Sequence, residues 1–204
     1  MDFSRFHEIV RNANSGFPVR FSMLREKVHF HHPGINHVKL YPVDLGTSGE
    51  RTAHYVLKDD PSDDMRESAD ALPCFNAEIR FCENLRDDHN DFNFVMTKEL
   101  MHVFDNENER VGSAQSFKNL LRDAETRQAP GVELTPEFRS EYYAYWRALV
   151  ILCPIEKRNE LKLKVENLEA SHFDVSEDFM IRTADVPAVL SDNFEAARRF
   201  FLGA

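Results

Sequence analysis

The sequence predicts an α+β fold, with a small β-sheet from the first half of the chain and helices from the second half. Apolar residues alternate with polar ones in segments between residues 28 and 85, and they recur at helical spacing from residue 91 onward. A chain of 204 residues can bury a substantial core. We therefore expect one domain over 1–204, with a strand-rich part at 1–90 and a helical part at 91–204.

The composition restricts the classes of function. The chain has 35 acidic and 25 basic residues, a net charge of −10, which argues against direct nucleic-acid binding and is compatible with a basic protein partner. Its 3 cysteines show no CxxC spacing, and no apolar run approaches the length of a membrane span or the apolar core of a signal peptide. We expect a cytoplasmic protein with no membrane association.

Elements of the first half follow from apolar periodicity and turn residues. Phe3, Phe6, Ile9 and Val10 predict a helix over 3–13. The segment 28–46 alternates and is split by Pro33-Gly34, which predicts two strands joined by a turn. The remaining expectations are a short helix at 22–27, a strand at 51–60, an exposed acidic loop at 59–70 and a half-buried strand at 75–85.

The second half is predicted to be helical. Thr135 and Pro136 are typical of a helix cap and first helical position, and this helix should end near Leu152, before Cys153-Pro154. The other expected elements are helices at 91–105, 113–127, 156–170, 176–182 and 193–202, with an extended segment at 173–175.

The chemistry of the chain centres on Lys98, Glu99 and His102 in the sequence KELMH. Residues one helical turn apart share a face, so Lys98 and His102 should project together with Glu99 adjacent. With histidine at position 98 this would be HExxH, in which two imidazoles bind zinc and the glutamate is the general base. A protonated lysine has no lone pair to offer a metal.

A further candidate carboxylate lies on a later helix. Glu141, Ala144, Ala148 and Ile151 form one stripe of the helix that begins at Thr135, and Glu141 is the only carboxylate in that stripe. Small residues allow close approach of another helix, so Glu141 could face the KELMH segment.

The order of these segments resembles the ImmA/IrrE family of zincin-like metallopeptidases. The resemblance rests on a strand AEIRF, the helix 94–102, the helix 141–154 and the segment 170–176. It implies a zincin-like fold, Glu99 as general base, and His102 and Glu141 as zinc ligands. Members of that family cleave DNA-binding repressors of the helix-turn-helix type, so the resemblance also implies such a repressor as partner.

Lys98 stands where that family has its first metal ligand. We expect a catalytically impaired, regulatory pseudo-metallopeptidase with no cofactor, in which the Lys98 ammonium pairs with Glu99 and Glu141 and replaces the metal charge. This hypothesis predicts that Lys98→Ala destabilises the fold and that Lys98→His creates metal binding.

Other interpretations remain open. An active peptidase could bind zinc through His102, Glu141 and a further ligand such as His172 or one of the histidines at 29–37, with Glu99 polarising water. A structural domain without inherited role is a third class, since a Lys-Glu pair on a helix is often a solvated face. Glu99-x-x-His102 and Glu169-x-x-His172 also match the spacing of di-iron bundles, although the strand-rich first half disfavours that fold.

One histidine cluster has no assigned role. It could bind a metal or respond to pH, but histidines at a turn are mostly solvated or locally hydrogen-bonded. Its members are His29, His31, His32 and His37.

Overall fold

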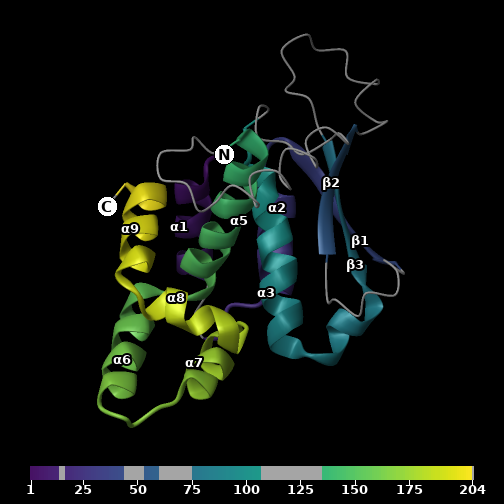
Figure 1. Cartoon of the computed structure of the whole chain (residues 1–204). Helices are drawn as coiled ribbons and strands as arrows, with labels where there is room; N and C mark the ends of the chain where they lie inside the picture. The colour runs from purple at the N-terminus through teal and green to yellow at the C-terminus, as the bar shows by residue number, and fades with distance from the viewer. Residues whose placement is uncertain (14–16, 44–52, 60–74, 107–134, 204) are drawn as a thin grey trace.

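The computed structural model describes residues 1–13, 17–43, 53–59, 75–106 and 135–203 (Figure 1). In chain order the elements are α1 (Phe3–Ala13), α2 (Phe21–His31), β1 (Ile35–Val43), β2 (Ala53–Asp59), β3 (Phe75–Cys82), the 3₁₀ turn η2 (Glu83–Asp87), α3 (His89–Leu100), the 3₁₀ turn η3 (Met101–Phe104), α5 (Pro136–Leu152), α6 (Ile155–Glu166), α7 (His172–Phe179), the 3₁₀ turn η5 (Thr183–Asp185), α8 (Val186–Leu190) and α9 (Asp192–Leu202).

The three strands form one sheet in the order β1-β3-β2, and this confirms the α+β class. The central strand β3 runs parallel to β1 and antiparallel to β2. Its position makes it more buried than the predicted half-buried strand, because Asn76 and Glu78 on its second face are also buried. The cost of burying the Glu78 carboxylate is offset by ion pairs of 3.0 Å to Lys58 and to Arg80.

The predicted hairpin around Pro33-Gly34 is wrong. The segment before it belongs to α2, which continues to His31 and buries Phe21, Leu24 and Val28 on one face. The segment after it, β1, pairs with the distant β3. The helical spacing of Phe21, Leu24 and Val28 was therefore a better guide to this segment than its alternation of apolar and polar residues. The Pro-Gly pair separates a helix from a strand.

Two boundaries in the C-terminal half also differ from the prediction. α6 ends at Glu166, four residues before the predicted end, and Leu168 follows with a left-handed φ of 61°. The predicted extended segment 173–175 is helical, because Ser171 and Asp174 form a reciprocal capping box that starts α7. Ser176, predicted to cap a helix, is instead buried within α7.

Other predictions are confirmed. The helix over 3–13 is α1, and Thr135 caps α5 by accepting a hydrogen bond from the Phe138 N–H, with Pro136 as first residue. The predicted loop at 59–70, beyond Asp59, and the predicted helix at 113–127 lie outside the described residues. Among the residues that the structure describes, no helix is both long and apolar enough to span a membrane.

The hydrophobic core extends from the N-terminal helices through the sheet to the C-terminal helices. α3 lies between the sheet and α5, and it contacts both (Figure 1). Ala144 and Ala148 of α5 are fully buried, as expected for small residues that let a neighbouring helix approach closely. This packing brings the KELMH segment of α3 and η3 beside the first turns of α5.

Candidate functional site

The helix that carries Lys98 and Glu99 is fixed at both ends. Asp88 caps α3 by accepting hydrogen bonds from the backbone N–H groups of Asn90 and Asp91, at 2.9 and 3.0 Å. The α-helix ends at Leu100, and the chain tightens into the 3₁₀ turn η3 that carries His102. The predicted single α-helix over 91–105 is therefore divided, and His102 does not continue the α-helical spacing from Lys98.

Lys98 bridges two glutamates from different helices. Its Nζ lies 2.9 Å from Glu99 Oε1 and 2.6 Å from Glu141 Oε2. The Glu99 side chain is 4% exposed, whereas that of Lys98 is 23% exposed and that of Glu141 is 33% exposed. The ion pairs hypothesised from the sequence are present in the structure.

The two glutamates keep Lys98 protonated. Burial alone lowers the pKa of the Lys98 ammonium, but the charges and hydrogen bonds of Glu99 and Glu141 outweigh it and raise the pKa well above 10.5. Burial likewise raises the pKa of Glu141, but the charges of Lys98 and His102 and the hydrogen bond with Lys98 lower it below 4.5 overall. Both partners are thus ionised at neutral pH.

His102 is held by a carboxylate on its other side. Its Nδ1 lies 2.7 Å from Asp105 Oδ2 and donates to this oxygen. Ser140 Oγ, 3.0 Å from the same Nδ1, donates to Asp105 Oδ2 at 2.5 Å. These contacts fix the orientation of the ring, so that Nε2 is the free nitrogen.

The free nitrogen of His102 faces the glutamates that Lys98 bridges. Nε2 lies 3.5 Å from Glu141 Oε1 and 4.0 Å from Glu99 Oε2, and Tyr55 of β2 stacks on the ring. Burial lowers the pKa of His102, but the hydrogen bond and charge of Asp105, with the charges of Glu99 and Glu141, raise it above 6.5 overall.

These residues form a buried charge cluster that extends further than the sequence predicted. Asp105 Oδ1 accepts a hydrogen bond from the Arg147 guanidinium at 2.9 Å. The cluster contains three carboxylates, two permanent cations and one histidine: Glu99, Asp105, Glu141, Lys98, Arg147 and His102. Two cations oppose three anions, so protonation of His102 makes the cluster neutral.

Three residues of this site were missed by sequence reasoning. Asp105 follows His102 by three residues, a spacing that places side chains on one helical face. Ser140 and Arg147 are seven residues apart, two helical turns on α5, and flank the stripe that was identified from Glu141. These spacings were visible in the sequence, but the contact between η3 and α5 was not.

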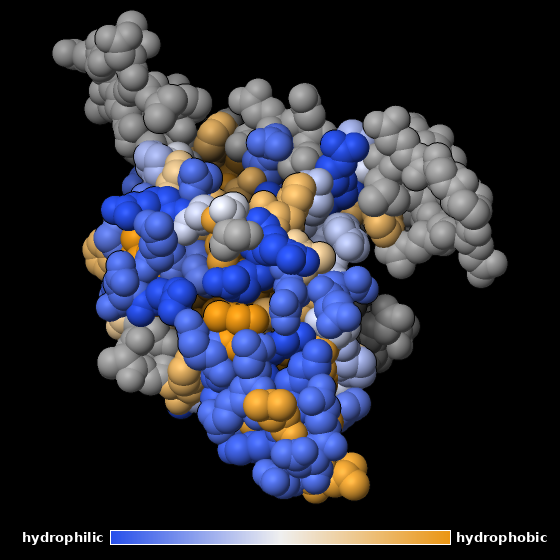
Figure 2. All heavy atoms as spheres, turned by 90° about the vertical axis from the view of Figure 1, so that its left-hand side faces the viewer, coloured by the Kyte–Doolittle hydropathy of each residue, from blue (hydrophilic) through white to orange (hydrophobic). Residues whose placement is uncertain are grey.

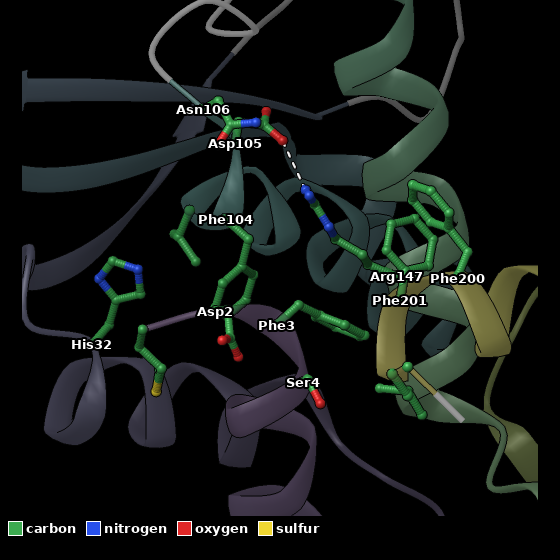
Figure 3. Close-up of a pocket in the computed structure, with 14 residues that line it drawn as sticks. Asp2, Phe3, Ser4, His32, Phe104, Asp105, Asn106, Arg147, Phe200 and Phe201 are labelled. Atoms are coloured by element: carbon green, nitrogen blue, oxygen red, sulfur yellow. Dashed lines mark hydrogen bonds and ion pairs between the residues drawn. The ribbon is translucent and has the colours of Figure 1, made fainter.

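A cavity of about 680 Å³ adjoins the buried charge cluster through Asp105 and Arg147 (Figure 3). Phe3 of α1, Phe104 of η3 and Phe201 of α9 line it. None of the four candidate site residues predicted from the sequence lines this cavity. It is therefore a neighbouring hollow that shares Asp105 and Arg147 with the buried charge cluster.

The residues around Lys98 do not fit a zinc ion. The ammonium lies within ion-pair distance of both carboxylates that would face the metal and has no lone pair to donate. In the described ranges, no three His, Cys, Asp or Glu side chains form a group suited to hold a metal ion. His172 therefore does not complete a set with His102 and Glu141.

The N-terminal histidines lie apart from this site. His29 stacks on His37 with ring centroids 5.2 Å apart, and His29 Nδ1 lies 2.6 Å from the carbonyl oxygen of Asn36. His32 lines the cavity beside Asp105 but is not within the buried charge cluster. His29, His31 and His37 are exposed, whereas His32 is partly buried against Phe104, and no shared function follows for the four.

No family model, curated protein or solved structure matches this chain.

Proposed function

We propose that this chain is a zincin-like protein of the ImmA/IrrE type that no longer hydrolyses peptides and acts by binding a protein partner. The observation that carries the proposal is the position of Lys98 Nζ, 2.9 Å from Glu99 and 2.6 Å from Glu141. An internal ammonium takes the place that a metal cation would need between these carboxylates.

The proposed loss of hydrolysis follows from the state of Glu99. A general base must accept a proton from a water molecule within hydrogen-bond reach. One oxygen of Glu99 already accepts from Lys98, and its side chain is 4% exposed. Without a Lewis acid to lower the pKa of a water, a buried, ion-paired carboxylate is a poor activator of that water.

The surroundings of His102 support descent from a metal site. Metal-binding histidines usually donate their second ring N–H to a carboxylate, which sets the tautomer and the direction of the free nitrogen. Asp105 accepts such a bond from Nδ1 at 2.7 Å, and Nε2 faces Glu141. The supporting contacts of a metal ligand are thus present beside a ligand position taken by Lys98.

The proposed partner is a basic protein, and a DNA-binding repressor is the class that the resemblance to ImmA/IrrE proteins suggests. The net charge of −10 favours association with a basic surface by long-range attraction. In this proposal the repressor is bound and sequestered, and its chain stays intact. Incubation with a helix-turn-helix repressor from the same genome, followed by mass spectrometry, distinguishes binding from cleavage.

Metal analysis of the purified protein tests the central claim. Wild-type protein purified without chelator should hold no stoichiometric zinc, and Lys98→His should bind about one equivalent through the introduced imidazole together with His102 and Glu141. Lys98→Met is the matched control, because it removes the ammonium without adding a ligand. Stoichiometric zinc in the wild type, lost in His102→Ala, would contradict the proposal and favour an active peptidase. Glu99→Gln would then abolish cleavage and retain the metal.

A further inference from the structure

The end of α6, the turn that follows and the start of α7 carry three exposed apolar side chains, Leu163, Leu168 and Phe173, which together are called the apolar tip. Their exposed fractions are 60%, 93% and 62%. Figure 1 places this turn at the lower end of the molecule, and Figure 2 shows hydrophobic side chains among hydrophilic ones at that end. Isolated exposed apolar residues are common on proteins, so exposure alone would not assign a role.

The backbone of Leu168 distinguishes this tip from ordinary surface residues. Leu168 has φ of 61° and occupies the position after the helix end where a Schellman motif favours glycine. The motif is complete: the Glu169 N–H donates to the Lys164 carbonyl at 2.8 Å, and the Leu168 N–H donates to the Val165 carbonyl at 3.1 Å. A leucine there is strained by its Cβ.

No packing of the Leu168 side chain offsets that strain, because 93% of the residue is exposed. The chain uses glycine for the same conformation at the end of α9, where Gly203 has φ of 68°. Met180, the other left-handed residue that is not glycine in the described part of the chain, is partly buried. A strained side chain that contributes little to the fold is a candidate for a contact outside it.

The charges around the tip indicate the kind of surface that would cover it. Glu166, Glu169 and Asp174 are carboxylates near the tip, and the nearby Lys164 already pairs with Glu160 at 2.6 Å. Between residues 163 and 174 one lysine opposes three carboxylates, a net charge of −2. Two copies of this tip would repel each other, and an anionic lipid surface would repel it too.

We propose that the apolar tip is a docking site for a protein partner whose surface has an apolar pocket bordered by lysine or arginine. Leu168 is the central anchor, Phe173 and Leu163 add flanking contacts, and the carboxylates set the orientation and the rate of association. The tip lies at the opposite end of the molecule from the Lys98 end of α3 (Figure 1). It is therefore a site separate from the one proposed above, and each proposal can fail without the other.

Selection of peptides from a phage-displayed library on immobilised wild-type protein provides the probe. We expect the selected peptides to combine aromatic or aliphatic residues with lysine or arginine. Their affinity, measured by fluorescence anisotropy, should fall at least about tenfold in Leu168→Gly and in Phe173→Ser. It should also weaken as salt rises, because salt screens the attraction between the carboxylates near the tip and the basic residues of the peptides. Phe30→Ser, at an exposed phenylalanine of α2, is the control and should leave binding unchanged.

Thermal unfolding separates loss of contact from loss of fold, since Leu168→Gly removes strain and should be at least as stable as the wild type. The proposal is overturned if selection yields no binder above background, or if the selected peptides bind Leu168→Gly and Phe173→Ser as tightly as the wild type. It is also overturned if sedimentation shows self-association that Leu168→Gly abolishes, or if anionic vesicles bind the wild type and not this variant.

Discussion

Replacement of Lys98 by methionine tests the electrostatic role of the ammonium most directly. Methionine keeps an unbranched side chain of similar length, so the change mainly removes charge. Without the ammonium between them, the Glu99 and Glu141 carboxylates face each other directly, and His102 lies beside both. Removal of one member of a buried ion pair costs about 3–5 kcal/mol, because the remaining charge stays desolvated.

The structure places Lys98→Met near the lower end of that range. Glu99 is almost fully buried, with 4% of its side chain exposed, so its charge would be poorly solvated. Glu141 is 33% exposed, so water screens part of its interaction. We expect a loss of about 3 kcal/mol in the free energy of unfolding, measured by urea denaturation at neutral pH.

Two further variants make the measurement decisive. Lys98→Met/Glu99→Gln removes the uncompensated charge and should recover a large part of the loss, because the neutral amide tolerates burial better. Lys164→Met removes an exposed pair with Glu160 and should leave stability nearly unchanged. A loss below about 1 kcal/mol for Lys98→Met would show that the ammonium acts as a surface charge, and the reasoning on the buried pair would be wrong.

Three other outcomes are expected. Arg158 is 1% exposed and donates to the carbonyls of Val189, Leu190 and Ser191 at the end of α8. Arg158→Met should therefore lower the free energy of unfolding by about 3 kcal/mol in urea denaturation. The same change at the exposed Arg11 should leave it nearly unchanged. Burial, with nearby arginine charges, lowers the pKa of His7 from 6.5 to about 4. Because the unfolded chain takes up this proton at a higher pH than the folded one, the free energy of unfolding is unaffected above pH 6.5 and falls by about 3 kcal/mol as the pH decreases to 4. His7→Phe should flatten the dependence of unfolding free energy on pH in that window, and an unchanged slope would exclude His7 as its cause. Leu168→Gly should raise the free energy of unfolding by about 0.5–1 kcal/mol, and the same change at Leu163, within α6, should lower it by about 1 kcal/mol.

Local signals predicted much of the helical part. Thr135 and Pro136 marked the start of α5 because capping and the fixed φ of proline depend on adjacent residues. The end of α6 was not predicted, because the residue after it is leucine where glycine is the usual signal. The start of α7 was recognisable from Ser171 and Asp174, but the extended interpretation of 173–175 overlooked this capping box.

Non-local pairing was less predictable. The alternation in 35–43 indicated a strand, yet its partner is β3, which begins about thirty residues later and runs parallel to it. A proline and a glycine between two apolar segments suggested a hairpin because that turn is local. The buried face of α2 and the choice of strand partner depend on the whole core, which local spacing does not describe.

For the candidate site, the sequence by itself determined the residue types and their order: Lys98 and Glu99 on one helix, His102 just after it, and Glu141 on a later helix beside a stripe of small residues. It also determined that position 98 offers no metal ligand, since this follows from the chemistry of lysine. The tertiary structure alone decided that Lys98 reaches Glu141 and that Asp105 joins His102 to Arg147. The Lys98–Glu141 and Asp105–Arg147 contacts connect residues about forty positions apart, and only the packing of α3 and η3 against α5 brings them together.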